Sequence, residues 1–302
     1  MSRSIRRGTG VRAGINALTV AFVVGVLAGL LLTPDGRAWL SNPTLMLGGQ
    51  ANASATAAET AAVEAPTEVE APVAPTSTLK TRYADGTLTI GVFGDSMADG
   101  LWAALYRDLG DLDGVDVVKF SEVSTGLSRY DYVDIQAKST RQLAERPVDV
   151  AIILFGTNDA QAIVIDGQIH QFGSDGWKAA YAQRVDNLVE LMRSRGAEVY
   201  WVGLPRMKSS GFDGRMTIIN DVVEARMTAL GVPYFDTVTL TSNEAGGYEA
   251  YLSDEDGRRR LMRAGDGIHM SMSGYLRMAD PVADRLKVDL GVAEAEAATA
   301  TP

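Results

Sequence analysis

A serine and a histidine in this sequence stand where they could act as a nucleophile and its general base. Ser96 follows an apolar run at residues 87–93, and His269 precedes a final amphipathic stretch. A serine hydroxyl is a weak nucleophile at neutral pH, so it needs a base that takes its proton. Asp266, three residues before His269, could accept the other imidazole N–H and fix the tautomer. With two histidines and no cysteine, the chain has only two sites for histidine chemistry and none for thiolates.

The segment at residues 94–96, Gly-Asp-Ser, allows three interpretations. Its serine could be a nucleophile, its aspartate could bind a metal together with the aspartate at 99, or either side chain could cap a helix. A calcium loop counted from Asp95 would place Met97 at position three and Tyr106 at position twelve, where oxygen ligands are needed. The metal interpretation therefore fails. An α/β-hydrolase elbow needs Gly-x-Ser-x-Gly, and Ala98 occupies its last position.

The first 80 residues do not have the composition of a globular domain. Arginines in residues 1–14 precede an uncharged, mostly apolar span at residues 15–32, which is long enough to cross a bilayer. Positive charge before the span predicts that the N-terminus stays in the cytoplasm and the rest is exported. We therefore expect residues 15–32 to be an uncleaved signal anchor. Residues 33–80, rich in Ala, Thr, Glu and Pro, are expected to form a spacer.

The remaining sequence predicts one α/β domain at residues 81–290, followed by a low-complexity tail at residues 291–302. Short β-branched runs alternate with amphipathic stretches, which is typical of a parallel sheet covered by helices on both faces. The expected strands are residues 87–93, 115–120, 148–155, 197–204 and 232–236. The expected helices are residues 96–109, about 130–145, 177–195, 214–230 and 273–286. In such sheets ligands bind at the carboxyl ends of the strands, which is where Ser96 lies.

Taken together, four loop segments resemble the SGNH, or GDSL-type, serine hydrolase superfamily. The matching residues are Gly94-Asp95-Ser96 with Gly100, then Gly126, then Gly156-x-Asn158-Asp159, and finally Asp266-x-x-His269. The match extends from residue 90 to about residue 286. It implies a flavodoxin-like three-layer α/β/α sandwich. Met97 replaces the family's usual leucine, and the residues around Gly126 lack the family's common pattern. An anchored, acidic domain of this type also resembles a poorly characterised bacterial branch of the superfamily.

The resemblance implies roles for five residues. Ser96 would be the nucleophile, His269 the base and Asp266 its partner. The backbone N–H groups of Ser96 and Gly126, with the side chain of Asn158, would form the oxyanion hole. No metal or cofactor is implied. The expected function is a serine esterase that hydrolyses carboxylic esters, including O-acetyl esters, through an acyl-enzyme in the periplasm or cell envelope. An O-acyltransferase acting on envelope glycans and a non-catalytic binding domain remain alternatives.

The expected partners follow from charge and location. A net charge of −10 argues against nucleic acid, because binding to phosphates needs a basic surface. A small-molecule or glycan ester is the expected substrate, and one N-terminal helix is the expected contact with the bacterial inner membrane. The sequence does not predict an oligomeric state.

Four further features of the sequence are not expected to take part in catalysis. His170 lies in a polar insertion and is expected at the surface or in a substrate loop rather than in catalysis. Trp177 and Tyr181, four residues apart, are expected to pack a helix. The charged run at residues 254–260 is expected to be a solvated face. Residues 237–264 are polar and contain glycine, so we expect a mobile loop at the rim of a pocket.

Overall fold

The structure is a computed structural model that describes residues 79–254 and 256–292. The expected anchor at residues 15–32 lies outside these residues, as do nearly all of the expected spacer and tail. Within the described residues, no helix is both long enough and apolar enough to cross a membrane.

A five-stranded parallel sheet forms the centre of the domain. Its strand order is β2-β1-β3-β6-β7, and every neighbouring pair in it is parallel. The strands are β1 Leu88–Gly94, β2 Val115–Lys119, β3 Val150–Leu154, β6 Glu198–Val202 and β7 Tyr234–Phe235. All five residues of β3 are buried, as expected for a central parallel strand covered on both faces. The expected fold class, a three-layer α/β/α sandwich with a flavodoxin-like sheet, is confirmed.

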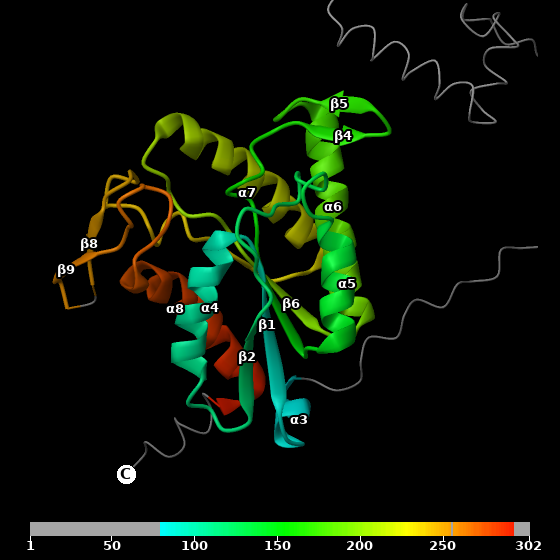
Figure 1. Cartoon of the computed structure of the whole chain (residues 1–302). Coiled ribbons are helices and arrows are strands. Elements are labelled where there is room, and N and C mark those ends of the chain that lie inside the picture. Colours follow the sequence, from blue (N-terminus) through cyan, green and yellow to red (C-terminus); the bar gives the residue numbers. More distant parts are fainter. Residues whose placement is uncertain (1–78, 255, 293–302) are drawn as a thin grey trace, which may run out of the picture. The chain divides into compact units, whose positions relative to one another are not determined.

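Helices cover both faces of the sheet (Figure 1). On one face α4 packs against α8, and on the other α6 packs against α5 and α7. The bounds are α3 Leu79–Ala84, α4 Ser96–Leu109, α5 Ile135–Glu145, α6 Asp175–Ser194, α7 Ser210–Leu230 and α8 Met272–Leu290. The sequence predicted α4 with its observed bounds and placed the other long helices within a few residues.

The contact between α4 and α8 brings the two ends of the domain's sequence together. A Cβ atom at Gly100 would lie 2.1 Å from the ring of Tyr275, so only glycine lets this ring of α8 lie directly on α4. The Tyr275 hydroxyl also lies 3.7 Å from the sulfur of Met97. Because α8 begins shortly after His269 and α4 begins at Ser96, this packing directs both residues to the same edge of the sheet.

Three loops emerge together at the carboxyl edge of the sheet. Gly94 at the end of β1 is the register partner of Leu154 at the end of β3. The loop after β2 joins them, because the amide of Glu122 donates to the carbonyl of Gly94 at 2.9 Å. Gly94 has φ +153°, and a Cβ there would meet the Leu154 carbonyl oxygen at 2.0 Å. The close approach of these two strand ends therefore requires glycine.

Two short hairpins were not expected from the sequence. One pairs β4 Ile163–Ile165 with β5 Gln168–His170, and the other pairs β8 Tyr251–Ser253 with β9 Arg259–Leu261. The first turns at Asp166 and Gly167, which have φ +50° and φ +77°. Asp-Gly is a strong signal for such a two-residue turn, but the flanking strands are too short to show clear alternation. Because the hairpin of β8 and β9 lies within residues 237–264, the loop expected there contains regular structure.

The helix α5 begins at Ile135 rather than near residue 130. Asp134 caps it, with a side chain that accepts from the amide of Ala137 at 2.9 Å.

On α6, Trp177 and Tyr181 are fully buried and stack with ring centroids 4.7 Å apart. The prediction that these two aromatic residues pack a helix is confirmed.

Candidate active site

The side chains of Asp266, His269 and Ser96 form one continuous hydrogen-bonded chain. His269 Nδ1 lies 2.7 Å from Asp266 Oδ2, and His269 Nε2 lies 2.8 Å from Ser96 Oγ. An ionised carboxylate can only accept, so the proton on the imidazole belongs at Nδ1 and the lone pair of Nε2 faces the serine hydroxyl. This arrangement places a general base within reach of the hydroxyl proton.

Asp266 is held in its ionised form by donors from its own turn. Its Oδ1 accepts from the amides of Ile268 at 2.9 Å and His269 at 3.0 Å. Burial alone would raise the pKa of this carboxyl, but the hydrogen bonds from the His269 imidazole and from these two amides outweigh it and lower the pKa to about 2. Asp266 therefore remains an acceptor for the imidazole throughout the neutral range.

Ser96 is the first residue of α4, directly after the helix cap. The side chain of Asp95 accepts from the amide of Met97 at 2.9 Å, which starts the helix. The amide of Ser96 belongs to the first turn, where the backbone N–H groups have no partner inside the helix. That N–H and the positive end of the helix dipole can both face negative charge developing beside the serine hydroxyl.

Asn158 is oriented by the neighbouring loop. Its Nδ2 donates to the carbonyl oxygen of Thr125 at 2.9 Å. Since a carbonyl can only accept, this contact fixes which end of the amide is the nitrogen. The second N–H of the same nitrogen remains as a donor. Residue 125 adjoins Gly126, so the side chain of Asn158 and the amide of Gly126 come from two loops that are bonded to each other.

A buried carboxylate, Asp159, holds the loop that contains Gly126. It accepts from the amides of Leu127 at 3.1 Å and Ser128 at 2.8 Å, from the Ser128 hydroxyl at 2.8 Å, and from the Tyr181 hydroxyl at 2.8 Å. Burial raises the pKa of Asp159, and these four hydrogen bonds oppose the rise. In the sequence, Asp159 is identified only as part of a motif. Nothing in the sequence indicates that its hydrogen-bond partners lie on the loop after β2 and on α6.

The fit between Gly126 and Asp159 predicts the effect of a single methyl group. A Cβ at position 126 would lie 2.2 Å from Asp159 Oδ1, and that carboxylate cannot move without losing its donors. Gly126→Ala should lower the free energy of unfolding by about 1–3 kcal/mol through overpacking. It should also cut any ester turnover about 10- to 100-fold, because it would shift the amide that the sequence predicts as an oxyanion donor.

Urea unfolding and steady-state kinetics measure both effects. Gly211→Ala is the matched control, because a Cβ at Gly211 in α7 has no heavy atom within 4 Å. Equal stability of the two variants would show that the loop relaxes and that its contact with Asp159 does not fix its position.

A second buried carboxylate, Asp95, holds the loop after β3. Its Oδ2 accepts from the Thr157 hydroxyl at 2.6 Å and from the amides of Thr157 at 3.1 Å and Gly156 at 3.3 Å. Burial raises the pKa of Asp95 to about 6, against the hydrogen bonds from Thr157, Met97 and Gly156, and the like charge of Asp159 adds to the rise. Asp95 thus links the start of α4 to the loop that carries Asn158.

The raised pKa of Asp95 predicts a pH-dependent stability. An exposed aspartate has a pKa of about 3.9, so between about pH 4 and pH 6 the folded chain keeps a proton that the unfolded chain has lost. The contribution of Asp95 to the free energy of unfolding should therefore fall by about 3 kcal/mol as pH rises through this window, and stay constant above it.

Urea unfolding of wild type and Asp95→Asn between pH 4 and pH 7.5 isolates this contribution. The stability difference, wild type minus variant, should shrink by that amount as pH rises, because asparagine does not titrate. A difference that stays flat with pH would mean that Asp95 is ionised over the whole range.

The other polar residues singled out in the sequence lie apart from this arrangement. Asp99 pairs with Lys119 at 2.7 Å. Within residues 79–254 and 256–292, no three His, Asp or Glu side chains are grouped so that they could hold a metal ion. His170 lies on β5 against Gly176 of α6, where an added Cβ would be 2.4 Å from its Nδ1. It makes no hydrogen bond to Ser96 or His269 in the described structure.

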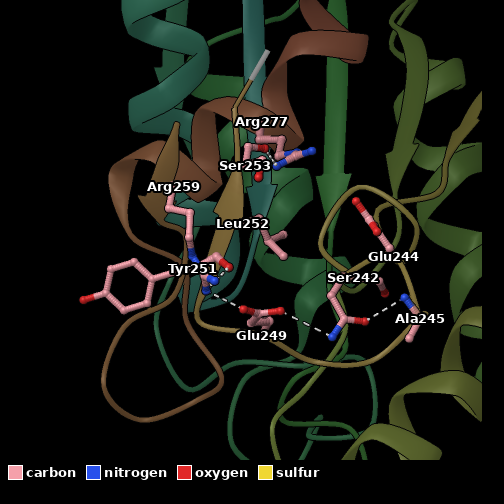
Figure 2. A pocket seen from close by; sticks show the side chains of 10 residues that line it. Ser242, Glu244, Ala245, Glu249, Tyr251, Leu252, Ser253, Arg259 and Arg277 are labelled. Carbon is pink, nitrogen blue, oxygen red and sulfur yellow. Dashed lines mark hydrogen bonds and ion pairs between the residues drawn. The ribbon is translucent and has the colours of Figure 1, made fainter. Parts of the chain in front are cut away.

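A polar cavity of about 510 Å³ is lined by residues of the predicted rim segment at residues 237–264 and by Arg277 of α8 (Figure 2). It opens between the loop that contains Ser242 and the hairpin β8–β9, and Glu249 on its wall accepts from Arg259 and Asn243. Neither Ser96 nor His269 lines it. The role of residues 237–264 in substrate binding thus stays a prediction. The charged run at residues 254–260 contains an ion pair between Arg260 and Asp254 at 2.9 Å.

The domain is similar to several solved structures. LAE5, described as an alpha/beta hydrolase enzyme from the metagenome of Lake Arreo, Spain, superimposes with a TM-score of 0.50 at 14% identity, covering 68% of this chain and 97% of that chain. A GDSL-like lipase from Bacteroides thetaiotaomicron gives 0.47 at 14% identity, covering 66% and 87%. An acetyl xylan esterase gives 0.48 at 15% identity, covering 66% and 99%. No curated protein matches this chain at a significant level.

The described domain therefore shares its α/β fold with LAE5. One family matches over most of the domain, from the start of β1 to the last turns of α8. Since residues 89–285 of the 302 match it, the chain belongs to the family described as Protein of unknown function (DUF459).

Proposed function

We propose that the chain is a serine esterase that hydrolyses carboxylic esters, with Ser96 as nucleophile, His269 as general base and Asp266 as its partner. The observation that carries this proposal is the continuous path of hydrogen bonds from Asp266 through His269 to Ser96. Asp95 caps α4, so helix capping explains neither the serine at position 96 nor the imidazole aligned with its hydroxyl.

The reaction follows from the two hydrogen bonds of His269. Ser96 Oγ attacks the ester carbonyl carbon while Nε2 of His269 takes the hydroxyl proton. The tetrahedral intermediate collapses, the bond to the leaving oxygen breaks, and His269 returns its proton to the departing alcohol. A water molecule, deprotonated by the same imidazole, then attacks the acyl carbon. The bond to Ser96 Oγ breaks, the imidazolium returns its proton to Oγ, and the carboxylic acid leaves. Asp266 stabilises the imidazolium that forms in each half of the reaction.

Three donors are available for the oxyanion. They are the amides of Ser96 and Gly126 and the second N–H of Asn158 Nδ2, and each such donor is typically worth about 3–4 kcal/mol in the transition state. The buried carboxylates Asp95 and Asp159 hold the loops that carry these donors. The donors are thus arranged before the substrate binds, which is the condition for electrostatic stabilisation without reorganisation.

The exposure of the site favours hydrolysis over transfer of the acyl group to another alcohol. The side chains of His269 and Asp266 are 36% and 47% exposed, so water reaches the base freely. An acyltransferase must keep water from its acyl-enzyme.

We propose carboxylic esters as substrates, with O-acetyl groups on envelope glycans as one class. From the arginines and the apolar span before residue 33, we also propose that the domain is anchored in the inner membrane and faces the periplasm, which protease protection in spheroplasts would test.

The test of the proposed function is turnover and covalent capture with the purified full-length chain. p-Nitrophenyl acetate and longer p-nitrophenyl esters should release nitrophenol, and a fluorophosphonate should label a single peptide that contains Ser96. The preference for chain length would give the size of the acyl pocket. A chain that neither turns over these esters, nor deacetylates acetylated glycans, nor takes the label would contradict the proposal and favour a binding domain on the same fold.

A further inference from the structure

The most unusual side chain outside the proposed triad is a buried arginine. Arg263 is 2% exposed and follows β9, three residues before Asp266. In the part of the chain that the structure describes, it forms no ion pair with a carboxylate, and its Nε has no hydrogen-bond partner. Burial of an arginine without a carboxylate is costly, because the charge loses its hydration. The contacts that Arg263 does make must offset this cost.

Those contacts gather on one short turn, residues 266–269. Nη2 of Arg263 donates to the carbonyl oxygens of Ile268 at 2.9 Å and Gly267 at 3.4 Å, the two residues between Asp266 and His269. Nη1 lies 2.8 Å from the sulfur of Met270, the residue that follows the turn. The guanidinium therefore contacts three of the four residues from Gly267 to Met270 with one planar group.

Two neighbours hold the guanidinium itself in place. Its plane lies over the ring of Tyr248, with the guanidinium carbon 5.1 Å from the centroid, which favours the cation. The sulfur of Met207 lies 3.6 Å from Nη2. The backbone also holds the turn: the amide of Lys208 donates to the Gly267 carbonyl at 3.1 Å, and the amide of Ala264 donates to the His269 carbonyl at 2.9 Å.

The side chains that do the proposed chemistry have little packing of their own. With about a third of His269 and half of Asp266 exposed, the direction of the imidazole depends on the backbone that carries it. We propose that Arg263 is the positioning residue of this turn: by binding the carbonyls of Gly267 and Ile268 from below, it holds His269 Nε2 at hydrogen-bonding distance from Ser96. This inference rests on the proposed function, and it adds a residue that none of the motif blocks contains.

The experiment compares Arg263→Met and Arg263→Lys with wild type in the full-length chain. Methionine keeps the apolar stem but loses all donors, so kcat should fall about 10- to 100-fold while KM changes less than about threefold, as expected when a base is displaced by a fraction of an ångström. Lysine keeps the charge and should recover part of kcat. In Arg263→Ala, guanidinium ion at about 20 mM should fill the vacated site and raise kcat several-fold.

A second readout does not depend on activity. The chain has only two histidines, so imidazole NMR signals can be assigned with His170→Gln. The Nδ1–H signal of His269, hydrogen-bonded to Asp266, should shift or broaden in Arg263→Met while the His170 signals stay unchanged. If wild type hydrolyses no ester, the proposed function fails, but this signal still tests the position of the turn.

Arg226→Met is the control, because Arg226 pairs with Asp186 at 2.8 Å between α7 and α6, on helices remote in sequence from the turn. It should change neither kcat nor the imidazole signals, and guanidinium should not stimulate it. The proposal is overturned if Arg263→Met keeps kcat within twofold and an unchanged Nδ1–H signal. If Arg263→Met does not fold, the guanidinium experiment on Arg263→Ala decides: a raised melting temperature without recovered kcat would leave Arg263 a packing residue only.

Discussion

Ser96→Ala is expected to reduce ester hydrolysis by about ten-thousandfold or more while leaving the fold intact. The hydroxyl is the only group at this position that can form the acyl-enzyme. Among the described residues, its side chain hydrogen-bonds only to His269 Nε2, so the substitution breaks no other side-chain hydrogen bond there. The amide of residue 96 remains in place as an oxyanion donor, and some substrate binding should survive.

The measurement is kcat/KM for p-nitrophenyl acetate, with the melting temperature as the check on folding. Ser273→Ala, at an exposed serine in the first turn of α8, is the matched control and should retain full activity. A Ser96→Ala variant that keeps more than a tenth of wild-type turnover would mean that the activity comes from another group.

His269→Gln is the second substitution with a large expected effect. Glutamine can still accept or donate a hydrogen bond, but it cannot take a proton from Ser96 and return it to the leaving alcohol. We therefore expect a loss close to that of Ser96→Ala. Because the two residues act as one unit, the Ser96→Ala/His269→Gln double variant should lose no more than either single variant.

The chain offers an unusually clean control for this experiment, since His170→Gln removes the only other histidine. His170→Gln should keep wild-type kcat/KM. Strictly additive losses in the double variant would contradict the hydrogen-bonded pair and would indicate that Ser96 and His269 contribute by separate routes.

The sequence predicted the sheet, its long helices and the loops that meet at the carboxyl edge, because these follow from local patterns. Alternating apolar runs and amphipathic stretches identify the strands and helices. Parallel pairing then places the ends of β1 and β3 side by side, as the Gly94 and Leu154 register confirms. The residue types Ser96, Asn158 and His269 could be selected without knowing any distance.

The features that the sequence did not reveal depend on contacts between distant segments. Asp159 is a motif residue in the sequence, yet its contacts lie on the loop after β2 and on α6. In the sequence, Arg263 looks like the other arginines of the nearby basic run. The structure shows that it is buried, whereas Arg258 and Arg260 are exposed. Predictions from sequence assign charged side chains to the surface, because that is where most of them lie. A buried charged side chain is therefore the kind of residue that such a prediction overlooks most easily.

The proposed nucleophile and its proposed base lie 173 residues apart, and the packing of α8 on α4, with Tyr275 on Gly100, brings them together. During synthesis, Ser96 is made before the turn that contains His269, which lies near the end of the domain. Until α8 has docked, the serine hydroxyl has no base beside it and is as unreactive as any surface serine. In the proposed mechanism, catalysis therefore requires α8 to be docked on α4, and we expect a C-terminally truncated chain that lacks α8 to hydrolyse no ester.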